Sequence, residues 1–158
     1  MLIKDMGSEK KILLFCLAVF CLRDVRGGRP DLGVSNGQLV PCPPTSNCVN
    51  SQATDENHTI QLFYYKGTPQ EAQEPLLRAL KSEERGQIIT ANESYIRAEF
   101  TSKLFRFVDD VEFYISKTLT DDIVIDIRSA SRIGSSDFGV NRKHIEQIRS
   151  NFLLSQSK

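Results

Sequence analysis

Apolar and polar residues alternate along three consecutive segments in the second half of the chain. The alternation is clear at residues 95–101, 108–116 and 123–129. Residues 60–65 and 86–91 have the aromatic and β-branched content that is typical of strands. The apolar series of the three alternating segments are Ile96, Ala98 and Phe100; Val111, Phe113 and Ile115; and Ile123, Ile125 and Ile127. A period of two with one polar face predicts an antiparallel sheet that is covered on one side only.

Two further segments have the apolar spacing of helices. Thr68, Pro69 and Glu71 form the pattern of a capping box with a proline in the first turn. An interior proline costs about 3 kcal/mol, so Pro75 leads us to expect that the long helix begins only at Glu74. The helix should end near Gly86. It should bury Ala72, Leu76, Leu77 and Leu80, and a last helix at residues 141–154 should bury Ile145, Ile148 and Phe152.

The order of these elements is strand, helix, four strands and helix, which argues against a doubly wound parallel sheet. We therefore predict an α+β two-layer sandwich over residues 59–154, mainly an antiparallel sheet with helices on one face. Residues 29–58 are rich in Pro, Gly, Asn and Ser, and we expect an irregular segment there. An irregular segment of that length in a compact domain should be pinned to the core or functional.

The first 28 residues differ from this globular pattern. Lys4, Lys10 and Lys11 precede eleven apolar residues at positions 12–22 (ILLFCLAVFCL). A membrane-spanning helix needs about 20 such residues, whereas a short apolar run behind lysines fits a secretory signal. A buried core helix is the alternative. We expect residues 1–28 to be a signal peptide or an N-terminal membrane anchor, and the protein to be exported (secreted, periplasmic or lumenal) or held at a membrane by residues 12–22.

Charge and cysteine content restrict the kinds of partner and site that we expect. The chain has 20 basic and 20 acidic residues, and a nucleic-acid surface would need a basic excess, so we expect no nucleic-acid partner. Removal of a signal would leave Cys42 and Cys48, which favour a short disulfide loop over free thiols or a metal site. Neither His58 nor His144 has ligand spacing to the cysteines, so we expect no metal, and no cofactor motif is evident.

Polar residues are concentrated at positions 128–142 (RSASRIGSSDFGVNR), between the last predicted strand and the last helix. Gly134 and Gly139 permit positive φ angles, and a loop that leads into a helix offers free N–H groups. Arg132 and Arg142 add positive charge, so the segment could hold a phosphate, a sulfate or a carboxylate. The glycine spacing matches neither a Walker loop nor a dinucleotide fingerprint.

An acidic cluster precedes this segment on the neighbouring predicted strand. Alternation turns Asp109 toward the core, and turns Asp110 and Glu112 the other way. If Phe113 faces Ile127, Glu112 lies opposite Arg128 and Asp109 lies opposite Ser131. A shift by two residues would set Glu112 against Asp126, and like charges directly opposite each other are destabilising. The first register is therefore preferred, and it joins the acidic and the Arg/Ser segments into one site.

Three separate motifs, in order, are similar to those of domain-of-unknown-function family 1499. They are CPPTSNCVNS, YIRAEFTSKLFRFVDDVEFYI and IDIRSASRIGSSDFGVNRKHIEQIR, and the resemblance covers residues 39–149. Ser46 and Asn50 depart from the family pattern, which has Pro and Ser there. The resemblance implies a small exported or membrane-associated protein of the kind found in bacteria and plastid lineages, and it implies no established reaction. The matching motif positions are Cys42, Asn47, Cys48, Ser51, Asp109, Asp110, Glu112, Arg128, Ser129, Ser131, Arg132, Gly134, Asp137, Gly139, Asn141 and Arg142.

Three functional hypotheses follow. The first is a non-enzymatic exported domain that binds a small polar or anionic ligand, or a protein partner. Such a domain could also associate with a membrane through its N-terminus. The second is a hydrolase-like enzyme with Asp109 or Asp110 as the base and Ser129 or Ser131 as the nucleophile, although Gly-x-Ser-x-Gly is absent. The third is a purely stabilising polar network. The expected ligand-binding residues are Asp109, Asp110, Glu112, Arg128, Ser129, Ser131, Arg132, Gly134, Asp137, Gly139, Asn141 and Arg142.

Overall fold

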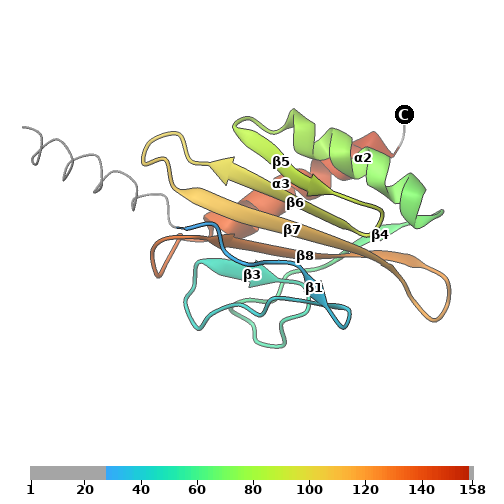
Figure 1. Ribbon diagram of the computed structural model, residues 1–158, viewed down its shortest axis with the longest axis horizontal. Helices are drawn as coiled ribbons and strands as arrows, with labels where there is room; N and C mark the ends of the chain where they lie inside the picture. The colour runs from blue at the N-terminus through green and yellow to red at the C-terminus, as the bar shows by residue number, and fades with distance from the viewer. Residues whose placement is uncertain (1–27, 157–158) are drawn as a thin grey trace, which may run out of the picture.

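A six-stranded antiparallel sheet and two helices form the body of the domain (Figure 1). The computed structural model describes residues 28–156, so the predicted signal or anchor lies outside the described residues except for Gly28. The strand order is β3-β8-β7-β6-β5, and β4 pairs with β8 on the same edge as β3. The α+β sandwich predicted from the sequence is thereby confirmed.

The predicted strands occur close to their expected bounds. They are β4 (Phe63–Tyr65), β5 (Gly86–Ala91), β6 (Tyr95–Thr101), β7 (Val108–Lys117) and β8 (Ile123–Ser131). In the β7–β8 hairpin, Phe113 pairs with Ile127 and Glu112 pairs with Arg128. The register that avoids like charges across the strands is therefore the one that forms.

Both helices pack on one face of the sheet, but the predicted start of the first helix is wrong. Helix α2 (Pro69–Ser82) begins at Pro69, and Pro75 lies inside it. The capping box of Thr68 and Glu71 forms completely, and Pro75 is buried, so capping and packing offset the missing backbone hydrogen bond. The helix also ends earlier than expected, at Ser82. Helix α3 (Val140–Ser155) follows the predicted pattern.

The hydrophobic core lies between this face and the two helices. Phe63 of β4 stacks on Phe152 of α3 with ring centroids 5.3 Å apart. Of the apolar residues predicted for α2, Leu77 is only partly buried, whereas the others are in the core. The fully buried large side chains include Phe63, Leu76, Ile96, Val111, Phe113, Ile123, Ile125, Ile127, Ile145, Ile148 and Phe152.

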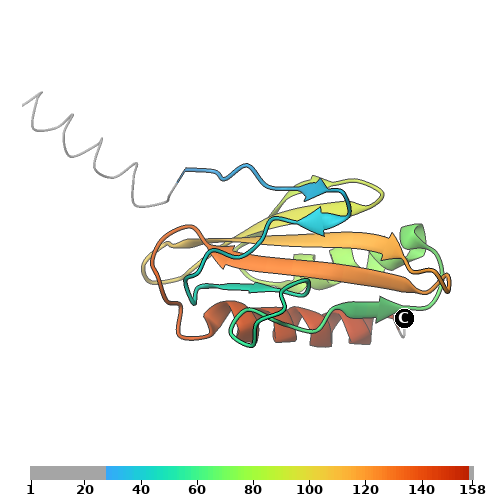
Figure 2. The same cartoon turned by 90° about the horizontal axis from the view of Figure 1, so that it is seen from below.

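The opposite face of the sheet is not left to solvent, contrary to the expectation of one-sided cover. The chain from Gly28 runs across it and forms a small hairpin of β1 (Val34–Ser35) and β2 (Gln38–Leu39) (Figure 2). The segment expected to be irregular thus contains two short strands here, and it contributes a third, β3 (Cys48–Asn50), to the main sheet. The polar residues of this face can be buried because they pair with one another.

Candidate functional site

The predicted site residues meet in register but lie on two faces of the sheet. Asp109 pairs with Ser131 and Asp110 pairs with Ala130 at the end where β7 starts and β8 finishes. Because side chains alternate along a strand, Asp109 lies on the helix side and Asp110 lies under the Gly28 to Leu39 segment. The single site expected from the sequence therefore consists of two separate polar networks.

On the helix side, Asn141 is the centre of a closed hydrogen-bond network. Its Nδ2 donates to Ser131 Oγ at 3.0 Å and to Asp137 Oδ2 at 2.7 Å, and its Oδ1 accepts from the Ser129 hydroxyl. The Ser131 hydroxyl in turn donates to Asp109 Oδ1 at 2.5 Å. Asn141 and Ser129 are buried, so the network fixes the start of α3 against the end of β8.

Asp137 occupies the N-terminus of α3. Its carboxylate accepts from the backbone N–H groups of Gly139 at 2.9 Å and Asn141 at 2.8 Å. Gly139 has φ +77° and Gly134 has φ +94°, so both glycines adopt the left-handed conformation that their sequence positions suggested. An external anion would have to displace Asp137 from these donors.

The disulfide loop braces the same corner. Cys42 and Cys48 are joined, as predicted. Asn47, just before Cys48, donates through Nδ2 to the carbonyl oxygens of Ser131 at 3.2 Å and Gly134 at 2.8 Å. The loop expected to be pinned to the core is thus pinned to the β8–α3 connection.

On the other face, two arginines hold Asp110. Arg97 Nη2 lies 2.6 Å from Asp110 Oδ1 and Arg132 Nε lies 2.7 Å from Asp110 Oδ2. Arg132 also contacts Glu99, which Arg29 reaches from the covering segment at 2.8 Å. Burial alone would raise the pKa of Asp110, but the hydrogen bonds from Arg132 and Arg97 outweigh it and hold that pKa below its usual range.

Glu112 and Arg128 form a second buried pair on this face. Their Oε2 and Nη1 atoms are 3.3 Å apart, and the Tyr95 hydroxyl donates to Glu112 Oε1 at 2.8 Å. Burial raises the pKa of the Glu112 carboxyl despite these partners, and burial together with Glu112 raises the pKa of Tyr95. The Arg128 Nε has no hydrogen-bond partner among residues 28–156.

The two arginines expected to attract an anion both have protein acceptors. Arg132 binds Asp110 and Glu99, and Arg142 donates to the carbonyl oxygens of Thr59 at 2.6 Å and Asn57 at 3.0 Å. These side chains therefore connect the strand, the loop and the helix at this corner, and a free anion would compete with these partners.

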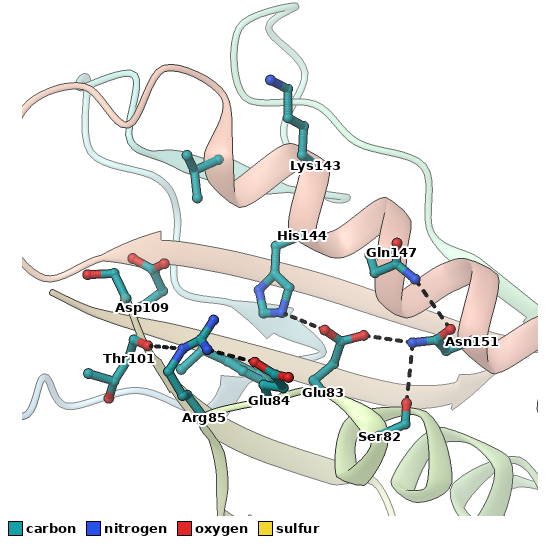
Figure 3. A pocket seen from close by; sticks show the side chains of 13 residues that line it. Ser82, Glu83, Glu84, Arg85, Thr101, Asp109, Lys143, His144, Gln147 and Asn151 are labelled. Carbon is teal, nitrogen blue, oxygen red and sulfur yellow. Dashed lines mark hydrogen bonds and ion pairs between the residues drawn. The ribbon is translucent and has the colours of Figure 1, made fainter. Parts of the chain in front are cut away.

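Next to this corner lies a cavity of about 620 Å³. It is bounded by the end of α2, one side of α3 and the end of β6, and Asp109 lines it from the start of β7 (Figure 3). The lining residues with chemically active side chains are Glu83, Glu84, Arg85, Asp109, Lys143 and His144. Of the predicted site residues, Asp109 is the one that reaches the cavity.

Asp109 has an unusual ionisation in this place. Burial raises the pKa of its carboxyl, the Ser131 hydrogen bond opposes the rise, and the nearby charges of Asp137 and Asp110 add to it. Because its pKa is raised, the Asp109 carboxyl is better able to exchange a proton near neutral pH than the Asp110 carboxyl, whose pKa is lowered. Asp109 therefore connects the hydrogen-bond network of Ser131 and Asn141 with the wall of the cavity.

His144 faces the same cavity from α3. Its ring packs edge-on against Phe100 at 4.4 Å between centroids, and its Nε2 lies 3.6 Å from Glu83 Oε2. Burial lowers the pKa of the imidazole, and the Glu83 carboxylate partly opposes this. His144 is thus neutral over much of the neutral pH range and can donate or accept a hydrogen bond.

Arg85 supplies a cation to the cavity wall. It stands on the turn from α2 to β5 with φ +60°, and its Nε donates to the Thr101 carbonyl at 3.2 Å while its Nη1 lies 2.8 Å from Glu84. Figure 3 shows its guanidinium between the Asp109 end and the His144 end of the cavity, whereas Lys143 points away from them. Arg85 is accordingly the positive group best placed for a ligand.

Several of these residues were not predicted from the sequence. Arg97 and Glu99 could have been, because they occupy the polar side of an alternating strand, and only the assumption of an open face hid their partners. His144, Glu83 and Arg85 carried no signal, because the cavity forms where α2, α3 and β6 meet and no local pattern records that meeting.

A comparison with protein-family models matches residues 38–152 to one family, described as a protein of unknown function (DUF1499). The chain belongs to the DUF1499 family. No curated protein matches the chain significantly. The match spans β2 to α3, so this DUF1499 domain includes the disulfide loop, the cavity and, apart from Arg29, both polar networks. The resemblance of the three sequence motifs to family 1499 is confirmed.

Two observations bear on the compartment of this DUF1499 protein. The Cys42–Cys48 disulfide hints at an oxidising environment. Within residues 28–156, neither helix is long and apolar enough to cross a membrane.

Proposed function

We propose that the domain binds a small polar ligand that carries an anionic group together with a hydrogen-bond donor, and that the cavity beside Asp109 is its site. The observation that carries the proposal is the convergence of Arg85, Asp109 and His144 on one cavity from three different elements. Arg85 would hold the anionic group, and Asp109 or Glu83 would accept from the donor. The volume of about 620 Å³ falls in the range of small-molecule sites, about 300–1,000 Å³.

The electrostatics favour a mixed ligand over a simple anion. Glu83, Glu84 and Asp109 also line the cavity, so its charge is not predominantly positive. A zwitterion such as a free amino acid offers both signs of charge, whereas inorganic phosphate offers only acceptors. Phe100 and Val140 add apolar wall that an aliphatic side chain could cover.

The proposal is tested by thermal unfolding of the full chain with a panel of probes. The panel is L-serine and L-glutamine as zwitterions, inorganic phosphate as a pure anion and glycerol as a neutral polyol. A zwitterion should raise the melting temperature saturably, and Arg85→Gln should abolish the rise. The matched control is Arg78→Gln on the exposed side of α2, which should leave the rise unchanged. Failure of every probe, or equal response in Arg85→Gln, would contradict the proposal.

A second candidate function is acid–base catalysis by Asp109. The raised pKa of its carboxyl and the presence of His144 in the same cavity favour it. Ser131 is a poor nucleophile here, because its hydroxyl already donates to Asp109 and accepts from Asn141, and it does not line the cavity. Hydrolysis of p-nitrophenyl acetate gives the test: rates for the native chain and Asp109→Asn should differ, and equal rates contradict catalysis.

We also propose that the protein is exported. Support comes from the disulfide and from the apolar run at positions 12–22 behind Lys10 and Lys11. Expression of the full chain in a secretion-competent host, followed by fractionation and N-terminal mass determination, tests it. Recovery in the cytoplasmic fraction with reduced Cys42 and Cys48 would contradict export.

A further inference from the structure

Five large apolar side chains are exposed at one end of the sheet. The connection from β6 to β7, residues 102–107, carries three of them, and Leu104 and Phe105 are 78% and 62% exposed. The connection from β8 and the first residue of α3 carry the other two, and Phe138 is 91% exposed. The five are Leu104, Phe105, Phe107, Phe138 and Val140. Exposed apolar residues that gather in one place indicate contact with another apolar phase.

The two connections lie at the same end of the domain. Asp109 at the start of β7 pairs with Ser131 at the finish of β8, and the cavity is lined by both Ser102 and Val140. Figures 1 and 2 show that the 102–107 connection and the β8–α3 connection both project at this end, away from the β7–β8 hairpin tip. We call residues 102–107 with Phe138 and Val140 the apolar end.

The 102–107 connection has the composition of a membrane-interface loop. Its sequence is SKLFRF, in which exposed Lys103 and Arg106 alternate with apolar residues and no acidic residue intervenes. The rings of Phe105 and Phe107 stack at 5.5 Å between centroids. Aromatic residues favour the boundary between headgroups and acyl chains, and each nearby Lys or Arg adds about 1 kcal/mol of attraction to an anionic surface.

The described chain also begins at the apolar end. Arg29 Nε lies 2.8 Å from Glu99, two residues before the last residue of β6. Leu22, the last residue of the apolar run in the sequence, is seven positions before Arg29. Seven residues span at most about 25 Å, so any membrane contact of that run would bring the bilayer within reach of the apolar end.

We propose that the apolar end docks on an anionic lipid bilayer. Leu104, Phe105 and Phe138 would enter the interface, while Lys103 and Arg106 would face lipid phosphates. The basic residues favour this occupant over a second copy of the chain, since two identical basic tips repel each other. The apolar end adjoins the ligand cavity, because Ser102 and Val140 line both. Leu104, Phe105 and Phe138 do not line the cavity, so docking does not require a ligand there.

Single tryptophan reporters test the docking, because the chain has no tryptophan. Phe105→Trp places one at the apolar end, and Leu119→Trp places a matched one at the fully exposed tip of the opposite hairpin. Each full-length variant is reconstituted with vesicles of phosphatidylcholine containing about 30% phosphatidylglycerol, with brominated acyl chains as quencher. Both variants carry the same N-terminus, so any anchoring by it is equal.

If the apolar end docks, the fluorescence emission of the indole at position 105 should shift to the blue and be strongly quenched. The indole at position 119 should show neither effect. Addition of Lys103→Gln and Arg106→Gln should lower the lipid affinity reported by the quenching at position 105 by about thirtyfold, since two cations contribute about 2 kcal/mol. Equal emission at both positions overturns the proposal. So does protection of position 105 without vesicles, which would show a protein partner or a second copy. Leu104→Trp replaces Phe105→Trp if the latter fails to fold.

Discussion

Asp109 and Asp110 are adjacent in sequence, lie on opposite faces of β7, and have pKa values shifted in opposite directions. Burial raises the pKa of Asp109, whereas Arg132 and Arg97 overcome burial and lower the pKa of Asp110. One carboxylate is a member of a buried ion-pair network that Arg29 and Pro30 cover, and the other lines a cavity on the helix side. Asp110 therefore belongs to the buried ion-pair network, whereas Asp109 is the carboxylate that reaches the cavity.

Replacement of Asp110 should strongly destabilise the fold. Asp110→Asn leaves Arg97 and Arg132 without their shared carboxylate in a buried place, and loss of one partner of a buried ion pair costs about 3–5 kcal/mol. Urea denaturation measures the change in the free energy of unfolding. The control, Asp122→Asn at an exposed position, should change it by less than about 1 kcal/mol. Equal effects of the two changes would contradict the assigned role of Asp110.

Replacement of Asp109 should act in the opposite direction at neutral pH. The folded-state pKa of Asp109 is raised above the unfolded value, so the folded state binds more protons between these two values and loses stability as pH rises through them. Asp109→Asn removes this loss, so the variant should be at least as stable as the native chain at pH 7. Below pH 3.8 the two should converge, because both side chains are then neutral. A variant less stable at pH 7 than at pH 3.5, relative to the native chain, would refute the assignment.

His144 should add a second pH dependence. Its pKa is lowered in the folded state, so the unfolded chain binds more protons just below pH 6.5 and stability falls as pH drops below that value. His144→Gln should remove this decline and leave the behaviour above pH 7 unchanged. Unfolding free energies measured from pH 7.5 to pH 5 check it, and an identical slope in the variant contradicts it.

Removal of the disulfide should cost about 2 kcal/mol, because a short loop restricts the unfolded chain only moderately. Cys42→Ser is the preferred change, since Cys42 is less buried than Cys48. Calorimetry of this variant and of the reduced native chain should give similar losses in melting temperature. Thiol labelling of Cys42 and Cys48 in the unreduced protein, located by peptide mass, would instead show that the bond is absent.

Asn141→Ala should destabilise by about 3 kcal/mol, because it leaves the buried Ser129 hydroxyl unpaired and removes two donors from Ser131 and Asp137. Gln147→Ala, at an exposed position of the same helix, is the control, with an expected cost below about 1 kcal/mol. Chemical denaturation of the two variants distinguishes a network centre from an ordinary helical amide side chain, and equal costs would contradict the network.

The sheet could be predicted from the sequence because strict alternation fixes both strand identity and face, and charge pairing fixed the β7–β8 register. The start of α2 could not, because the cost of Pro75 is local while the compensating packing is tertiary. Cover of the second face was missed for a related reason. Arg97, Glu99 and Asp110 look like solvent-facing residues until Arg29 and the Pro30 carbonyl close over them.

The candidate site was predicted in part. Asp109, Ser131, Asn141 and Asp137 were expected to lie together and do so. The cavity could not be predicted from the sequence. Arg85, Glu83 and His144 come from a turn and two helices, and their approach depends on the packing of α2 against α3. Short-range patterns specify which face a residue takes, and a cavity is the space that several such faces leave between them.

An NMR titration of the isotope-labelled full chain with L-serine and L-glutamine tests whether the cavity binds a polar ligand through Arg85 and Asp109. Saturable shifts should appear at the His144 ring and at residues around Arg85 and Asp109, and Arg85→Gln should abolish them. Arg78→Gln should leave them intact. Absence of saturable shifts with either amino acid, or shifts that persist unchanged in Arg85→Gln, would contradict ligand binding in this cavity.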